Sequence, residues 1–162
     1  MIKRSAALVA TLGALCAGVI AAAPIASADS SAESCRSWEI NSSGHAIGWV
    51  GEPGGVTLDS CWLIDTSIPD APWAEIGYTT QAAGIDPCAQ LVDVTAGGTW
   101  AHNYGCAGWT KADQGETYIP MNPAADLALT HGHKYVIQVG YWADLGSGLK
   151  YYGNVQSPVY NY

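Results

Sequence analysis

The sequence contains no phenylalanine and few basic residues: six lysines and arginines stand against fourteen acidic residues among 162. Proteins that bind nucleic acid need clustered lysine and arginine to contact the phosphates, and attraction to an anionic membrane surface needs the same charges. We therefore expect neither nucleic acid nor a membrane surface as a partner. An acidic excess of this size mainly keeps a protein soluble.

The sequence also lacks the motifs that mark common catalytic sites. It contains no Gly-x-Ser-x-Gly nucleophile elbow, no Gly-rich phosphate loop, no Cys-x-x-Cys redox pair and no calcium loop of alternating aspartates. The carboxylates available for glycoside hydrolysis are scattered among expected turns, and solvated surface charge explains them more simply (Asp59, Asp65, Asp70 and Glu75). We expect a protein that is not an enzyme and that uses no cofactor.

The N-terminal region has the three parts of a secretory signal peptide. Lys3 and Arg4 supply the positive start, residues 6–23 form an uncharged apolar run, and a small-x-small pattern ends at Ala28. Pro24 and this pattern favour cleavage over the alternative, an uncleaved membrane anchor, which the length of the run allows. We expect residues 1–28 to be removed and the mature protein to be secreted and extracellular, with no membrane association. Four basic residues against fourteen acidic ones then give it a formal charge of −10.

Four cysteines remain after cleavage: Cys35, Cys61, Cys88 and Cys106. An even number in an exported chain indicates two disulfides. Three pairings are possible, and we favour Cys35–Cys61 with Cys88–Cys106 because sequential pairs close the shortest loops. A structural zinc site is the alternative, but the spacings of 26, 27 and 18 residues lack its closely spaced cysteine pairs.

Short apolar stretches separated by Gly, Pro and Asn turns indicate an all-β domain. The expected strands cover residues 37–40, 45–50, 56–65, 74–80, 91–95, 99–104, 116–121, 135–142 and 149–155. Asp86 and Pro87 suit the N-cap and first position of a single helical turn. Residues 29–34 are small and polar, so we expect a flexible N-terminal tail, followed by one β-sandwich domain over residues 35–162.

The stretch from Leu129 to Trp142 carries the clearest local pattern. A turn containing Gly132 leads into Tyr135, and from there apolar side chains recur on one face at every second position (Tyr135, Ile137, Val139 and Tyr141). This stretch resembles the tyrosine corner of immunoglobulin-like and fibronectin type III domains, in which a tyrosine hydroxyl bonds back to the preceding turn. The resemblance implies an immunoglobulin-like β-sandwich, with the hydroxyl of Tyr135 bonded near residues 129–132.

Seven tryptophans and nine tyrosines take the place of phenylalanine. Both residue types carry a polar group, so they suit half-buried positions and binding surfaces. One interpretation is that four of them simply fill the core (Trp38, Trp49, Trp62 and Tyr135). Sixteen such residues exceed what the interior of this domain needs, so others are expected to be exposed and to contact a partner. We select Trp142, Tyr152, Tyr160 and Tyr162 for this role.

Two of the four histidines, His131 and His133, lie two residues apart. On a strand they would share a face and suit zinc or copper. Because they fall in the turn before Tyr135 and no third ligand is evident, we interpret them as turn residues and expect no metal site.

In its overall profile the chain resembles small secreted streptomycete proteins. Among these are the adaptor subunits that join lectins to the stalk of umbrella toxin particles. The resemblance implies a non-catalytic adaptor that binds another secreted protein in competition between bacteria. Two alternatives remain open. One is a carbohydrate-binding, lectin-like module, and the other is an inhibitor of a secreted hydrolase that presents a disulfide-tied loop between Cys88 and Cys106.

Overall fold

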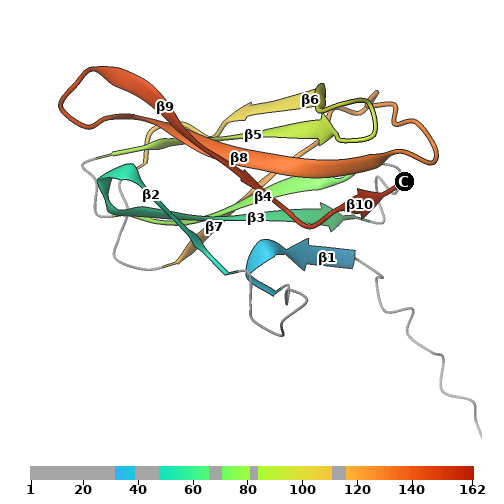
Figure 1. Ribbon diagram of the computed structural model, residues 1–162, viewed down its shortest axis with the longest axis horizontal. Coiled ribbons are helices and arrows are strands. Elements are labelled where there is room, and N and C mark those ends of the chain that lie inside the picture. The colour runs from blue at the N-terminus through green and yellow to red at the C-terminus, as the bar shows by residue number, and fades with distance from the viewer. Residues whose placement is uncertain (1–31, 39–47, 66–70, 81–83, 111–115) are drawn as a thin grey trace, which may run out of the picture.

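The computed structural model describes residues 32–38, 48–65, 71–80, 84–110 and 116–162 (Figure 1). The expected signal peptide, residues 29–31 of the expected tail, and parts of the first two expected strands lie outside these residues. Within the part of the chain that is described, no helix has the length and apolar character needed to cross a membrane.

The described residues form two antiparallel five-stranded sheets that pack face to face (Figure 1). The first sheet contains β1 (Ala32–Cys35), β2 (Val50–Glu52), β3 (Val56–Ile64), β4 (Trp73–Thr79) and β7 (Thr117–Met121). The second contains β5 (Asp86–Asp93), β6 (Thr99–Cys106), β8 (Lys134–Asp144), β9 (Leu149–Gln156) and β10 (Tyr160–Asn161). Two short 3-10 turns, η1 (Arg36–Trp38) and η2 (Pro53–Gly55), follow β1 and β2. The expected all-β sandwich with two disulfides is confirmed.

Strand order leaves β3 and β4 at the centre of the first sheet and β5 and β8 at the centre of the second. In the first sheet β1 and β2 share one side of β3, and β7 lies beyond β4; in the second, β9 and β10 share one side of β8, and β6 lies beyond β5. The core forms where the central strands face one another, and its largest members include Leu58, Ile76, Leu91, Ile137, Val139 and Tyr141. In the second sheet, β6 and β9 therefore lie on opposite sides of the central pair β5 and β8.

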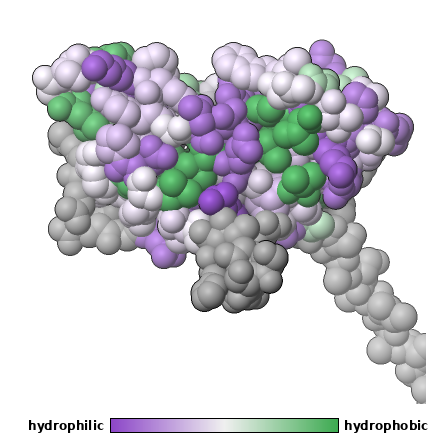
Figure 2. Space-filling model, viewed as in Figure 1, coloured by the Kyte–Doolittle hydropathy of each residue, from purple (hydrophilic) through white to green (hydrophobic). Residues whose placement is uncertain are grey.

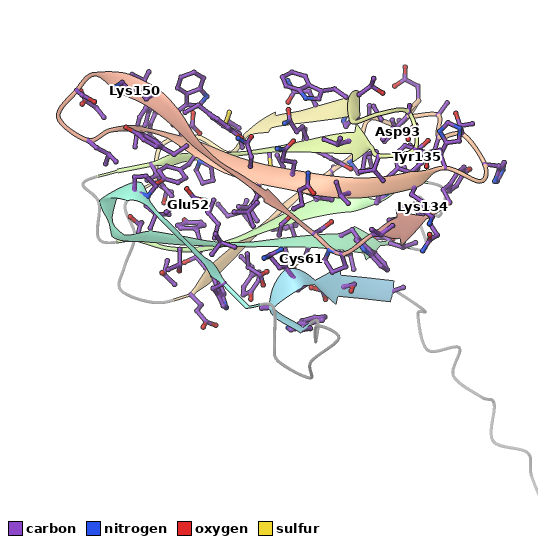
Figure 3. All side chains as sticks on the ribbon, viewed as in Figure 1. Glu52, Cys61, Asp93, Lys134, Tyr135 and Lys150 are labelled. Carbon is purple, nitrogen blue, oxygen red and sulfur yellow. A yellow bond between two sulfur atoms is a disulfide. The ribbon has the colours of Figure 1, made fainter. Side chains whose placement is uncertain are left out.

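The alternation expected after Tyr135 is present in β8. Tyr135, Ile137, Val139 and Tyr141 are all at most 2% exposed, because the period of two turns them towards the first sheet. The hydroxyl of Tyr135 accepts the backbone N–H of Thr130 at 2.9 Å, so the expected bond to the preceding turn is confirmed. Figure 3 shows Tyr135 beside Asp93 at the end of the sandwich where this turn lies.

Tyrosine hydroxyls explain why the core uses tyrosine in place of phenylalanine. Tyr141 in the second sheet donates to the carbonyl oxygen of Pro53, in the turn that joins two strands of the first sheet. Tyr104 donates to the carbonyl oxygen of Pro72, just before β4. Burial, with the nearby charge of Glu52 adding to it, raises the pKa of Tyr141 to about 12. These rings fill the core while their hydroxyls tie the second sheet to the first.

The disulfides follow the favoured pairing, Cys35–Cys61 and Cys88–Cys106. Each joins residues that lie directly opposite one another, the first between β1 and β3 and the second between β5 and β6. Both bonds therefore attach an outer strand to its neighbour within one sheet. The segment between Cys88 and Cys106 is a disulfide-linked β-hairpin formed by β5 and β6.

Two local expectations are wrong. Ala32–Ser34 do not belong to a flexible tail: with Cys35 they form β1, whose pairing with β3 the disulfide holds in register. Asp86 and Pro87 do not start a helical turn, because they pair with Trp142 and Tyr141 at the beginning of β5. Proline is tolerated at the start of a strand, and pairing with β8 outweighs the local capping preference.

Candidate binding cleft

A cleft of about 460 Å³ lies on the outer face of the second sheet, across β6, β5, β8 and β9. We call it the outer cleft. Its lining comprises Cys88, Ala89, Gln90, Trp100, Asn103, Cys106, Trp142, Tyr151 and Asn154. This volume lies in the range of ordinary ligand pockets, and none of the lining residues is charged. In Figure 3, aromatic rings stand on the side of this sheet that faces away from the first sheet.

Two aromatic rings form one wall of the outer cleft. Trp142 in β8 and Tyr151 in β9 lie opposite one another, with ring centroids 5.5 Å apart and planes at 65°. Tyr151 extends over Gly140, where an added Cβ would lie only 2.3 Å from its hydroxyl oxygen. Burial raises the pKa of Tyr151, which agrees with a ring held against the sheet. Trp100 in β6 is 69% exposed and supplies the other aromatic surface.

Three side-chain amides supply the polar groups of the cleft. Nε2 of Gln90 donates to Oε1 of Gln138 at 2.9 Å, and Oδ1 of Asn103 accepts the backbone N–H of Gly105 at 2.9 Å. The third amide belongs to Asn154. These contacts orient two of the amides before any ligand binds.

β-bulges position the residues at both sides of the cleft. In β9, Asn154 is an extra residue between the pairs Val139–Val155 and Gly140–Gly153, and its φ of 88° is the one positive value among the described non-glycine residues. In β6, pairing with β5 shifts twice, on either side of Asn103. Bulges redirect side chains and occur often beside binding sites. The Cys88–Cys106 disulfide joins β6 to β5 next to this irregular stretch, at the end of β6.

Of the four residues expected to contact a partner, Trp142 lies in the outer cleft and is 38% exposed. Tyr152 was expected to be exposed, and this is wrong: it is half-buried, packs against the core and stacks on Tyr141 with centroids 5.6 Å apart. The bulge at Asn154 explains the error. Counting in twos from buried Val155 places Tyr152 outside, but the extra residue turns Tyr152 inward and Tyr151 outward.

Tyr160 and Tyr162 were also expected to be exposed, and both are half-buried against the core. Tyr160 lies in β10 with its ring centroid 5.4 Å from that of Trp62. The backbone N–H of Tyr162 donates to the carbonyl oxygen of His133, and its ring stacks on His131 at 4.5 Å. The chain end therefore adds to the sheet, because strand pairing satisfies backbone groups that a free tail would leave to water.

Sequence patterns missed two tryptophans and misplaced a third. Trp100 and Trp109 are exposed, at 69% and 59%, and Trp38, which was considered as a core residue, is also 59% exposed. Trp100 pairs with Val92 of β5, beyond two shifts of register in β6. Figure 2 shows the hydrophobic residues on one side of the molecule as separate patches divided by hydrophilic ones.

The three histidines among the described residues, His102, His131 and His133, do not converge on a shared site. Nδ1 of His133 lies 2.7 Å from Oδ2 of Asp93, whereas His131 stacks on Tyr162. Two groups of potential metal ligands occur among the described residues, one around Cys35 and Cys61 and one around Cys88 and Cys106. Neither group includes a histidine, and sulfurs engaged in a disulfide do not supply thiolate ligands.

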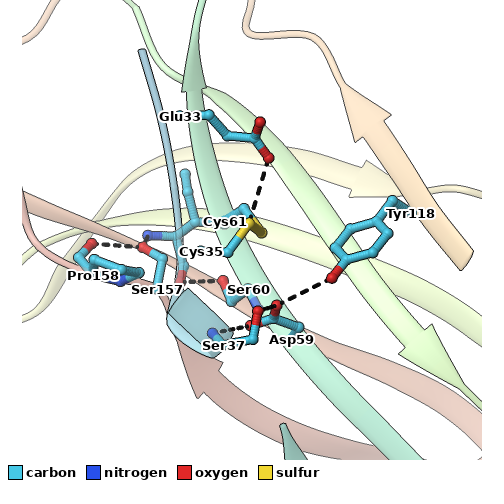
Figure 4. Close-up of a disulfide and its surroundings, with 10 residues drawn as sticks. Glu33, Cys35, Ser37, Asp59, Ser60, Cys61, Tyr118, Ser157 and Pro158 are labelled. Carbon is cyan, nitrogen blue, oxygen red and sulfur yellow. Dashed lines mark hydrogen bonds between the residues drawn. A yellow bond between two sulfur atoms is a disulfide. The ribbon is translucent and has the colours of Figure 1, made fainter. Parts of the chain in front are cut away.

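The outer face of the first sheet carries acidic residues whose roles are structural. Asp59 is fully buried, and its carboxylate accepts the backbone N–H groups of Ser37 and Ser60, at 3.0 and 2.9 Å, and the hydroxyl of Ser37 (Figure 4). Beside it, burial together with a hydrogen bond to Glu33 raises the pKa of Glu75 to about 7. Figure 4 shows Glu33 pointing towards the Cys35–Cys61 disulfide.

No protein-family model, curated protein or solved structure matches this chain. The function of the outer cleft is therefore inferred from its chemistry. Its lining offers aromatic rings for contact and amides for hydrogen bonding, and it has no titratable pair suited to general acid and base catalysis.

Proposed function

We propose that this chain is a secreted, non-catalytic adaptor that binds another secreted protein through the outer cleft. The observation that carries the proposal is an uncharged aromatic cleft on a strongly acidic chain. Tryptophan and tyrosine are the residues that most often dominate the energy of protein interfaces, whereas charged residues are depleted from interface cores. Trp100, Trp142 and Tyr151 give the cleft this composition.

The two disulfides support the secreted part of the proposal. Disulfides persist in oxidising compartments and are rare where glutathione keeps thiols reduced. The positive, apolar and small-x-small parts of residues 1–28 add the export signal. From the resemblance to umbrella toxin adaptors, we further propose that the partner is a subunit of an antibacterial toxin particle.

One observation favours a second candidate, a carbohydrate-binding module. The amides of Gln90, Asn103 and Asn154 lie around the aromatic rings, and amides pair well with sugar hydroxyls while rings cover the apolar face of a sugar. A neutral polysaccharide also matches the uncharged lining.

Pull-down from culture supernatant distinguishes these functions. The immobilised mature protein should retain one defined protein, and Trp142→Ala should release it because Trp142 forms part of the cleft wall. Trp38→Ala is the matched control, since Trp38 is more exposed than Trp142 but belongs to η1, which contacts β3 of the first sheet. Retention of a polysaccharide and no protein would contradict the adaptor proposal and support the second candidate.

A further inference from the structure

We propose that a second pocket, where β2 of the first sheet meets β9 of the second, binds a small zwitterion with one carboxylate and one primary ammonium group, such as a free amino acid. We call it the side pocket, and its volume is about 270 Å³. Its lining comprises Arg36, Val50, Glu52, Gly153, Asn154, Val155 and Gln156. The proposal goes beyond the adaptor function, which uses the outer cleft.

The fold brings one positive and one negative side chain to the side pocket. Glu52 is the last residue of β2, which pairs with β3, and Arg36 is the first residue of η1, which contacts the same strand. β9 contacts β2 and supplies the opposite wall. Figure 3 shows Glu52 near the place where the two sheets face one another. Both charged groups therefore reach the pocket from the first sheet.

Arg36 and Glu52 line one pocket, yet no ion pair or hydrogen bond joins them to one another. Nε of Arg36 is buried and finds no hydrogen-bond partner within the described parts of the chain. A buried donor without an acceptor is costly, so a ligand that accepts a hydrogen bond from this atom gains free energy.

The carboxyl group of Glu52 is in a matching position. It precedes η2 but makes no side-chain hydrogen bond to cap it. Burial raises its pKa above the ordinary value of 4.5. This is the response of a carboxylate that loses hydration without gaining a positive neighbour. A ligand that brings a positive charge to Glu52 would compensate that loss.

The pair of opposite charges selects among possible ligands. An anion would meet Arg36 but would be repelled by Glu52 and by a mature chain in which four basic residues stand against fourteen acidic ones. A cation would be repelled by Arg36, and a metal ion would find a single carboxylate in the lining. A ligand without charges would leave both groups unpaired. A zwitterion pairs with each of them and adds no net charge.

The remaining groups of the side pocket fit an amino acid. The Nε–H and a terminal N–H of a guanidinium form two parallel bonds to the oxygens of one carboxylate. A primary ammonium has three donors, for which Glu52 and the amide oxygens of Asn154 and Gln156 are acceptors. Val50 and Val155 add apolar surface for a short side chain. The volume lies below the range of pockets for drug-sized ligands, so it suits a ligand of few atoms.

The test is calorimetric titration of the mature disulfide-bonded protein with glycine, L-alanine, L-valine and L-leucine. Each is compared with two derivatives that keep one charge: the amide keeps the ammonium, and the N-acetyl derivative keeps the carboxylate. We expect at least one of the four amino acids to bind. Both of its derivatives should bind at least about tenfold more weakly, because each leaves one charge of the pocket unpaired.

Two variants separate the two contacts. Arg36→Gln should weaken binding of the amino acid by about tenfold without weakening the amide, which has no carboxylate for Arg36. Glu52→Gln should weaken the amino acid by a similar factor without weakening the N-acetyl derivative. Lys150→Gln and Glu116→Gln are the matched controls, since both residues are exposed and lie outside the lining, and both variants should bind as the wild type does.

Three outcomes overturn the proposal. One is that none of the four amino acids binds. Another is that an amide or N-acetyl derivative binds as tightly as its parent, since one charge would then suffice. The last is that Lys150→Gln weakens binding as much as Arg36→Gln, which would assign the effect to net charge. None of these outcomes alters capture of a supernatant protein through Trp142, so the adaptor function is judged by its own measurement.

Discussion

Tyr151 crosses directly over Gly140, so closely that a Cβ at Gly140 would lie 2.3 Å from its hydroxyl oxygen and 2.5 Å from the carbonyl oxygen of Tyr152. The wall of the outer cleft therefore depends on a residue without a side chain in the neighbouring strand. Neither the ring nor the backbone of β9 has room to accept an added methyl group at this position.

Gly140→Ala should consequently destabilise the fold by about 1–3 kcal/mol, as overpacking does elsewhere. Gly51→Ala is the matched control, because an added Cβ there meets nothing within 4 Å and its φ is ordinary. The two denaturation midpoints in urea decide the comparison. Equal midpoints would show that β9 does not lie as close to Gly140 as described.

Tyr135→Phe should lower the free energy of unfolding by about 1 kcal/mol, because the backbone N–H of Thr130 loses its acceptor. Tyr162→Phe serves as the control, since the contacts of Tyr162 run through its ring and its backbone. The denaturant midpoint reports the change. A midpoint equal to that of the control variant would contradict the assignment of the tyrosine corner.

Stability should fall as the pH rises from about 4.5 to about 7, because Glu75 has a pKa near 7 in the folded chain and an ordinary value of 4.5. Below about pH 4.5 the Glu75 carboxyl group is protonated in both the folded and the unfolded chain, so it does not reduce stability. Between the two values the unfolded state releases a proton that the folded state keeps, so unfolding becomes more favourable. Above the higher value the loss is complete.

Glu75→Gln should flatten this dependence, because glutamine keeps a hydrogen-bonding group without the charge. Glu116→Gln removes an exposed acidic residue and controls for the change in net charge. Urea midpoints measured between pH 4.5 and 8 give the three profiles. Parallel profiles for the wild type and Glu75→Gln would refute the role of this carboxyl group.

Export should yield a chain that begins at Asp29 with both disulfides intact. Intact-mass spectrometry of protein recovered from culture medium is expected to show this N-terminus and a mass about four hydrogens below that of the reduced form. A chain that keeps residues 1–28, or free thiols on any of the four cysteines, would be inconsistent with the expected leader and compartment.

The sequence predicted those features that depend on regular alternation or on cysteine pairing. Counting in twos from Tyr135 identifies the buried side chains of β8, because that strand is regular over this stretch. The disulfides follow from pairing sequential cysteines, and the structure shows why: each pair joins adjacent antiparallel strands.

Of the aromatic residues that line the outer cleft, only Trp142 was predicted from the sequence to contact a partner. Local irregularities of the strands explain why. A bulge adds one residue to a strand, and it reverses the face of every side chain beyond it. Asn154 does this in β9, so Tyr151 and not Tyr152 reaches the cleft. In β6 two such shifts, at Tyr104 and Ala101, interrupt the alternation around Asn103. The sequence alone does not predict the bulges of β6 and β9, because their positions are set by pairing with β5 and β8.

The most direct test of the adaptor proposal is the dissociation constant of the captured partner protein for three forms of the mature chain. The wild type and Trp38→Ala should bind equally, and Trp142→Ala should bind more weakly by roughly thirtyfold, which corresponds to about 2 kcal/mol for an aromatic residue at the centre of an interface. Equal affinities for the wild type and Trp142→Ala would contradict the assignment of the outer cleft as the binding site.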